Sequence, residues 1–279
     1  MEIRDILLFL EAGEPCAARL DLAVSLAERS GAALTGLCAW RMPALEPVDT
    51  YAVGLKAMDD VLLREEAAAG ERIAPIKAAF SERTSRRNVE SLWTLAALYE
   101  SPQDLALHAR CFDLAILRRP LVHDHEGRRL AERVALRSGT ACLIVPEQPL
   151  RSASLDRVVL AWDGGREAKR AMDAAMDLLK AAANVRLVVV DGEGAECPPP
   201  LAPEVVLRHL ARHGIAADLR RVHAAHEDAG PALLEHCAEF DADLLVMGAY
   251  GHSVAEEVVF GGATRAVLAD AALPVMMAH

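Results

Sequence analysis

The sequence lacks the features that mark membrane, secreted and nucleic-acid-binding proteins. No apolar run approaches the ~20 residues that a helix needs to cross a bilayer. The N-terminal segment MEIRDILLFLEAGE has acids on both sides of a short apolar run, whereas a signal peptide has a basic start and a longer apolar stretch. The net charge of −11 disfavours a nucleic-acid partner, which requires a basic surface. We expect a cytoplasmic protein with neither a membrane nor a nucleic-acid partner.

The sequence also lacks recognised catalytic and metal-binding signatures. Its six cysteines are scattered without a CxxC pair, which is typical of reduced, buried thiols. It contains no GxSxG, no GxxxxGK[ST] and no Cys–His pair with a local signature. His209 and His213 share a predicted helix face, and His123 and His125 share a polar loop, but neither pair has a third ligand nearby. We predict no catalytic residue and no protein-held metal.

What the sequence does contain is a regular alternation of strand-length apolar runs and amphipathic helical segments. This alternation predicts an α/β fold with a parallel sheet and right-handed crossovers. A long helical segment spans residues 51–80, with Gly70 and Pro75 as candidate breaks. The predicted strands are residues 3–10, 33–40, 92–99, 113–117, 141–145, 157–162, 184–190, 217–224, 243–247 and 274–279.

The two halves of the chain repeat each other. LFLEAGEPCAARL aligns with LAWDGGREAKRAM, so Glu11 corresponds to Asp163, and CFDLAIL aligns with DADLLVM. Residues 146–155 contain two prolines and several polar residues, which indicates a linker. The repeat is domain-sized, so we expect one domain at residues 1–147 (the first half) and another at residues 155–279 (the second half).

The second half contains a candidate phosphate cradle. A strand over residues 243–247 ends at Gly248, Gly251 follows, and nine residues later Gly261 and Gly262 precede a predicted helix. Glycine lets backbone amides approach an anion closely, and a helix N-terminus adds unpaired N–H groups and a positive dipole end. The carboxyl ends of parallel strands form the usual ligand edge where strand order reverses.

These residues resemble the universal stress protein family, and the whole chain looks like a tandem member. The resemblance rests on the glycine spacing, on WDGG at residues 162–165 and on the final PVMMAH. It implies two Rossmann-like domains (adenine nucleotide alpha hydrolase-like), each a five-stranded parallel sheet of order 3-2-1-4-5. It also implies ATP, AMP or ADP between strands 1 and 4, with Mg²⁺ only as a companion of ATP. The implied binding residues are Asp163, Gly164, Val246, Met247, Gly248, Gly251, His252, Gly261, Gly262, Ala263 and Thr264.

In that family Asp163 would meet the ribose or adenine and the glycine loop the phosphates, but the chain departs from the family pattern here. Gly262 stands where the family has Ser or Thr, and Thr264 could substitute for the missing hydroxyl. DGGREA lacks both serines of the SGGxDS motif found in a related ATP-using enzyme fold, so at most weak ATPase activity is expected.

The first half departs further from the pattern. Arg118 replaces Gly248, and no GxxG follows, so we expect a degenerate domain without nucleotide. Arg118, Arg119, Arg128 and Arg129 form a basic patch, either salt-bridged or a docking site for an anionic partner.

Two functions remain open. The protein is either a nucleotide-binding sensor or switch in a stress response, or a nucleotide-free scaffold that acts through protein contacts. The resemblance also implies that ACLIV and PVMMA pair within one chain as a pseudo-dimer, which a homodimer of such chains could extend.

Overall fold

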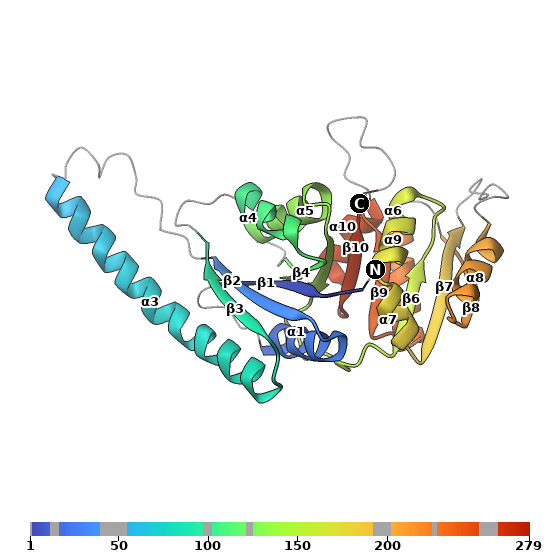
Figure 1. Cartoon of the computed structure of the whole chain (residues 1–279). Helices are drawn as coiled ribbons and strands as arrows, with labels where there is room; N and C mark the ends of the chain where they lie inside the picture. Colours follow the sequence, from blue (N-terminus) through green and yellow to red (C-terminus); the bar gives the residue numbers. More distant parts are fainter. Residues whose placement is uncertain are drawn as a thin grey trace.

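A computed structural model describes residues 2–11, 17–39, 55–96, 102–120, 125–191, 202–224, 228–250 and 262–279. Within these ranges the chain forms a ten-stranded sheet flanked by helices (Figure 1). None of the helices in these ranges combines the length and the apolar character that crossing a bilayer requires.

The first half follows the predicted alternation. Its elements are β1 (Asp5–Glu11), α1 (Ala17–Ser30), β2 (Ala33–Ala39), α3 (Leu55–Arg86), β3 (Ser91–Leu95), α4 (Pro102–His108), the 3-10 turn η1 (Ala109–Cys111), β4 (Leu114–Arg118), α5 (His125–Arg137) and β5 (Ala141–Val145).

The second half repeats this order. Its elements are β6 (Arg157–Ala161), α6 (Arg166–Ala174), α7 (Met176–Ala181), β7 (Asn184–Asp191), α8 (Pro203–Arg212), β8 (Ala217–His223), α9 (Ala229–Glu239), β9 (Leu244–Gly248), α10 (Gly262–Asp270) and β10 (Val275–Ala278). Two helices, α6 and α7, follow β6 and meet at Ala175.

The expected break in the long helix of the first half is wrong. Helix α3 continues for 32 residues through Gly70 and Pro75, and in Figure 1 it extends beyond the β3 edge of the sheet. A proline inside a helix costs about 3 kcal/mol. Here Ile76 and Phe80, within two turns after the proline, are buried in the core, and the Phe80 ring packs at a tilt against Trp93 with 5.5 Å between ring centroids. This burial offsets the cost of the proline and keeps the helix continuous.

The sheet has the order β3-β2-β1-β4-β5-β10-β9-β6-β7-β8. Each half therefore has the expected 3-2-1-4-5 order with parallel neighbours. The halves join where β5 and β10 pair antiparallel, with Leu143 opposite Met276. The expected pairing of ACLIV with PVMMA is thus present within one chain, and it leaves β3 and β8 as the outer strands.

Two apolar cores lie on opposite faces of the sheet. Helices α1, α3, α6, α7 and α8 contribute to one core, and α4, α5, α9 and α10 contribute to the other. The central strands are buried on both faces, as the uninterrupted burial of β4 and β5 shows. This explains why their sequences are continuous apolar runs rather than alternating patterns.

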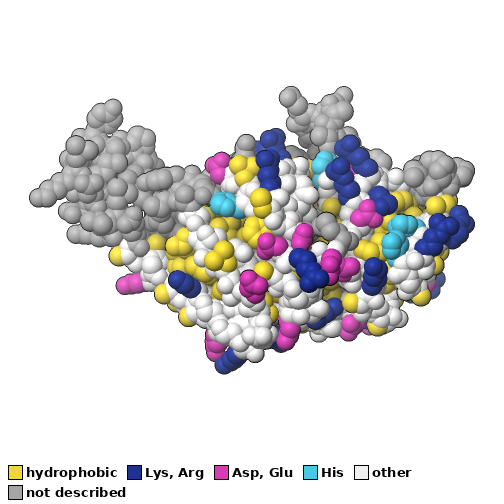
Figure 2. Space-filling view, in the orientation of Figure 1, with side chains coloured by type: hydrophobic (Ala, Val, Ile, Leu, Met, Phe, Trp, Pro, Cys, Tyr) yellow, Lys and Arg dark blue, Asp and Glu magenta, His cyan; other side chains and the backbone are white. Residues whose placement is uncertain are grey.

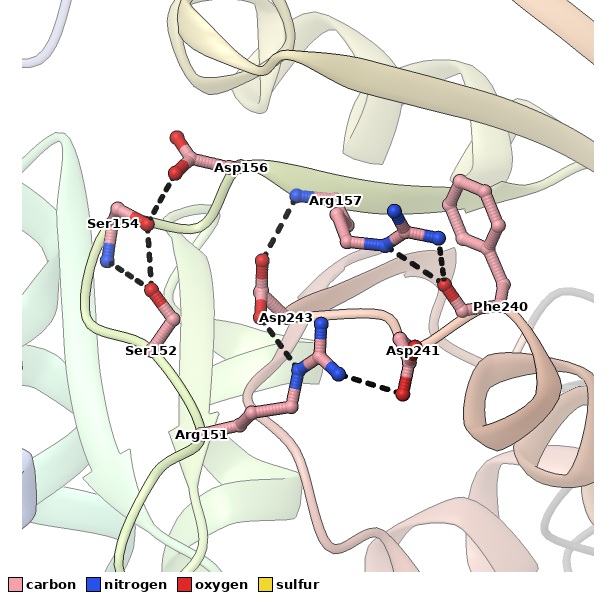
Figure 3. A network of polar contacts seen from close by, with 8 residues as sticks. All are labelled: Arg151, Ser152, Ser154, Asp156, Arg157, Phe240, Asp241 and Asp243. Atoms are coloured by element: carbon pink, nitrogen blue, oxygen red, sulfur yellow. Dashed lines mark hydrogen bonds and ion pairs between the residues drawn. The ribbon is translucent and has the colours of Figure 1, made fainter.

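The linker is fastened to the second half by charged contacts (Figure 3). Arg151 lies 2.6 Å from Asp241 and 3.4 Å from Asp243, measured between the guanidinium nitrogens and the carboxylate oxygens. Asp243 in turn accepts the backbone amide of Arg157 at 3.0 Å, which fixes the start of β6 beside β9.

In the first half, an aspartate at the matching position also accepts hydrogen bonds from backbone amides at the start of a strand. Asp113 accepts the backbone amides of Arg4 at 2.8 Å and of Asp5 at 3.0 Å, and so fixes the start of β1 beside β4. Both aspartates lie at the amino ends of the strands, opposite the edge where a ligand is expected. The aspartate that precedes strand 4 in both halves, in Phe112–Asp113 and Ala242–Asp243, therefore has a structural role: it positions strand 1 beside strand 4.

Candidate functional site

The candidate site lies at the carboxyl edge of β6 and β9. These strands pair in parallel, with Leu160 opposite Val246, so their ends reach the same edge of the sheet. Asp163 follows β6 and Gly248 ends β9, and the structure therefore brings both to one side of the molecule. Gly251, His252 and Gly261 lie outside the described residues.

Asp163 shapes the turn between β6 and α6. Its Oδ1 accepts the Gly165 amide at 2.7 Å, and Gly164 has a φ of +80°, a conformation that favours glycine. Gly165 is the N-cap residue of α6 and no side chain caps that helix. The carboxylate of Asp163 is exposed at the sheet edge, where it remains accessible to a ligand.

Gly248 has a packing role that the sequence did not indicate. A Cβ at this position would lie 2.6 Å from the Ala168 amide nitrogen and 2.8 Å from the Glu167 carbonyl carbon. No side chain fits at those distances unless the backbone moves. The glycine therefore lets the start of α6 lie directly against the end of β9.

Val246 and Met247 contribute their side chains to the two cores rather than to the edge. Val246 is buried on the face of α6, and Met247 is buried on the face of α9 and α10. What these two residues could offer a ligand is therefore backbone.

The start of α10 completes the described part of the site. Gly262 is its first residue, is exposed, and would place an added Cβ in open space. Thr264 is buried, and its hydroxyl oxygen accepts the Tyr250 amide at 3.3 Å, so it joins the helix to the residues after β9. The first turn of α10 carries no acidic side chain. Its unpaired N–H groups and dipole are suited to an anion.

Two charged residues at this edge were missed from the sequence. Arg265, in the first turn of α10, is exposed and adds a positive charge. Glu167, in the first turn of α6, is buried and forms an ion pair with Arg166. Burial raises the pKa of Glu167, but hydrogen bonds from Arg166 and its own amide, with the charges of Arg166 and His279, outweigh this and lower it. Both could have been found from the sequence, because Glu167 closely follows WDGG and Arg265 closely follows Gly262.

His279 also lies at this edge. Its Nδ1 is 2.9 Å from the Ala249 carbonyl oxygen, and its own carbonyl oxygen accepts a hydrogen bond from Arg170 at 2.6 Å. Basic and acidic side chains are intermingled over the face of the molecule seen in Figure 2. A phosphate site here would therefore depend on local geometry rather than on a broad positive surface.

The matching edge of the first half has a different construction. Glu11, in the position of Asp163, accepts a hydrogen bond from Arg19 at 2.9 Å and lies 3.4 Å from Arg118. Arg118, in the position of Gly248, is only 8% exposed. A buried cluster of charged side chains thus occupies the edge where the second half has a glycine in close contact with a helix.

Arg118 fits the salt-bridged alternative for the predicted basic patch, although it is buried rather than on the surface. Arg118 is buried beside Glu11, and Arg119 donates a hydrogen bond to the carbonyl oxygen of Ala269 in α10. Their positions after a strand could not reveal that both side chains turn inward or across to the other half.

The histidine pair on α8 lies as the spacing predicted. The rings of His209 and His213 are 4.8 Å apart, and burial together with the His213 charge lowers the pKa of His209. Among the described residues, no group of three or more His, Cys, Asp or Glu side chains could hold a metal ion. His123 lies outside those residues.

A model of the universal stress protein family matches residues 154–279. A universal stress protein from Archaeoglobus fulgidus is 14% identical with a TM-score of 0.75, covering 98% of this chain and 94% of its own. A putative universal stress protein from Pseudomonas aeruginosa is 15% identical with a TM-score of 0.56, covering 98% and 92%.

A protein of unknown function from Pseudomonas aeruginosa, also 15% identical, has a TM-score of 0.57 over the same shares of the two chains. No curated protein matches the sequence. At these identities the structural likeness shows the fold, which extends over both halves. Residues 154–279 are a universal stress protein domain, and the N-terminal half of the chain repeats the fold of that family.

Proposed function

We propose that the second half binds ATP, or the related nucleotides AMP or ADP, at the carboxyl edge of β6 and β9, and that the protein works as a nucleotide-dependent sensor or switch in a stress response. The observation that carries the proposal is the meeting of Asp163, Gly248 and the start of α10 at one edge. This is where strand order reverses and where open α/β sheets bind ligands.

Each part of the site would have a separate role. The phosphates would lie against the N–H groups of Gly262 and Ala263, with the glycines at 251 and 261 allowing close approach and Gly248 offering its backbone at the end of β9. The exposed Asp163 carboxylate would accept hydrogen bonds from the ribose or adenine. Mg²⁺ would arrive with ATP, because the sequence predicts no ligand set of its own. The proposal is binding rather than turnover.

The two halves would divide the work between them. We propose a nucleotide domain at residues 155–279 and a degenerate domain at residues 1–147 that serves as its partner. The four cysteines that the structure describes are free thiols, which is in keeping with the reducing cytoplasm that we propose as its location. A homodimer of such chains and an unidentified protein partner belong to the same proposal.

Isothermal titration calorimetry with MgATP tests this proposal, together with mass spectrometry of nucleotide released from the purified protein. Binding is expected to saturate below millimolar ATP and to be lost in Gly251→Val, which would place a branched side chain in the glycine segment. Absence of heat at millimolar ATP and absence of co-purified nucleotide would favour the nucleotide-free scaffold instead.

The missing hydroxyl at position 262 provides a finer test. Gly262→Ser adds a donor for a phosphate oxygen, and an added Cβ there meets no atom within 4 Å. A hydrogen bond to a charged acceptor contributes about 1.5–3 kcal/mol, so MgATP affinity should rise about tenfold or more. Gly262→Ala is the matched control, because it adds the Cβ without the hydroxyl, and its affinity should stay near that of the unmodified protein. Equal affinities of the two variants would show that no phosphate oxygen reaches this position.

A further inference from the structure

The first half contains a pocket of about 420 Å³ at the carboxyl edge of β4 and β5. This volume lies in the range of small-molecule sites, which is roughly 300–1,000 Å³. Arg19 and Arg118 contribute its cationic groups. The start of α1, the end of β5 and the linker supply apolar walls, which include Ala17, Ala18, Val145, Pro149, Leu150 and Ala153.

Arg19 has unmet hydrogen-bonding capacity in this pocket. The residue is 3% exposed, and its Nη2 donates to Glu11 at 2.9 Å. Its Nε and Nη1 have no hydrogen-bond partner in the part of the chain that the structure describes. A buried donor without a partner destabilises the folded protein, and a charged one does so more strongly. Arg19 therefore lines the pocket and has two buried donors whose hydrogen-bonding capacity is unmet.

The pocket is lined by both basic and acidic side chains. Glu11 lies within ion-pair distance of both Arg19 and Arg118, so one carboxylate faces two guanidinium groups. Asp21, in the wall, is itself paired with Arg83 at 2.6 Å. Glu147, on the linker, is the remaining carboxylate of the lining and is partly exposed. Glu147 therefore places a negative charge in the wall of the pocket that contains Arg19.

We propose that this pocket binds a small organic carboxylate with an apolar body. The cationic Nε and Nη1 donors of Arg19 suit carboxylate oxygens as charge-assisted hydrogen-bond partners, and the aliphatic walls accept the body of the ligand. The proposed site is independent of the nucleotide site in the second half. It uses the edge at which Arg118 replaces the glycine of the second half.

Octanoate is the probe for this proposal, with acetate as the head group alone and octan-1-ol as the uncharged body. Titration calorimetry of the full chain is expected to show saturable binding of octanoate. Acetate and octan-1-ol should each bind at least about tenfold more weakly, because each loses one of the two sets of contacts. Equal binding of octanoate and octan-1-ol would contradict a carboxylate site.

Two variants separate the site from general effects on folding. Arg19→Ala is expected to weaken octanoate about tenfold or more. Sequence alignment of the halves places Ala171, which is fully buried, at the matching position of α6, so the fold accommodates alanine there. Ala153→Trp keeps every charge and should also weaken binding by filling the pocket. Arg212→Ala, which removes an exposed arginine of α8, is the control and should leave binding unchanged.

A third variant changes affinity in the opposite direction. Glu147→Gln removes the opposing carboxylate of the wall and should strengthen octanoate binding severalfold. Failure of octanoate to bind the unmodified protein, or binding that survives both Arg19→Ala and Ala153→Trp, would overturn the proposal. Either result would show a solvent-filled pocket around a purely structural ion cluster.

Discussion

The two halves of this chain share a fold and differ at one edge of it. At the amino ends of the strands, Asp113 and Asp243 accept backbone amides at the start of β1 and of β6. At the carboxyl ends, Gly248 contacts α6 closely, whereas Arg118 at the matching position is buried beside Glu11. The shared contacts define the sheet, and the differing contacts lie at the edge where we propose that the second half binds a nucleotide.

This difference shows that the two ends of the strands are under separate physical constraints. At the amino ends, the carboxylates of Asp113 and Asp243 accept hydrogen bonds from backbone amides that need a partner in each copy of the fold. The carboxyl edge can be filled either by a helix lying against a glycine or by a buried ion cluster. An edge of the second kind retains the sheet while it loses the geometry of a glycine cradle.

The largest expected effect comes from transferring the arginine between halves. Gly248→Arg adds a long side chain at a position where an added Cβ alone would lie 2.6 Å from the Ala168 nitrogen. Overpacking typically costs about 1–3 kcal/mol, and we expect more than about 3 kcal/mol here because the clash is with backbone. Urea unfolding followed by circular dichroism measures it. Gly70→Ala, in open space on α3, is the control and should be neutral or stabilising.

The ion cluster of the first half should be the next most sensitive feature. Glu11→Gln removes the carboxylate that faces Arg19 and Arg118, so the buried Arg19 loses the charged acceptor of its Nη2 and Arg118 loses one ion-pair contact. We expect a loss of roughly 3 kcal/mol in the free energy of unfolding, at the lower end of the range for a broken buried pair.

Asp163→Asn is the matched change in the second half. It should cost less than about 0.5 kcal/mol, because Asp163 is exposed and the amide oxygen can still accept from Gly165. Equal costs for the two variants would mean that the two edges do not differ in this respect.

Removing the aspartate at the amino ends of the strands should lower the free energy of unfolding by similar amounts in both halves. Asp113→Ala and Asp243→Ala each leave strand-start amides without an acceptor, and we expect each to cost about 1–3 kcal/mol in urea unfolding. Asp156→Ala, which removes an exposed carboxylate, is the control and should stay within about 0.5 kcal/mol. A large cost in one half with none in the other would show that the repeated aspartate has two different roles.

The smallest expected effect concerns pH. The pKa of Glu167 is lowered in the folded protein, so its ionised form stabilises the fold above its ordinary pKa. That contribution is lost as pH falls through the folded pKa. Glu167→Gln should therefore make stability fall less steeply on the acid side, which unfolding curves at a series of acid pH values would measure. Glu235→Gln, at an exposed position of α9, should leave the slope unchanged.

Much of the fold could be predicted because its signals are local. Continuous apolar runs identify strands buried on both faces, and the alternation with helices predicts parallel order. The aligned segments around Glu11 and Asp163 revealed the repeat and its reversal point. The continuity of α3 could not be predicted, because the packing of Phe80 on Trp93 offsets the effect of Pro75.

The candidate site could be located but not described from the sequence. The glycine at position 248 indicated a loop, but only the structure reveals the helix that lies against it. Thr264 offered a hydroxyl, yet that oxygen accepts the Tyr250 amide inside the protein. The contact of Glu11 with Arg19 and Arg118 joins three separate elements, and no spacing in the sequence encodes it.

The antiparallel junction of β5 with β10 has an evolutionary consequence. In a dimer of identical chains related by a two-fold axis, every substitution appears on both sides of the interface. Here the paired strands belong to one polypeptide, so a change in one copy leaves the other untouched. The protein can therefore have Arg118 at the end of β4 in the first half and Gly248 at the end of β9 in the second half, the two places where strand order reverses. Covalent fusion has released the two edges from symmetry, and each is free to specialise.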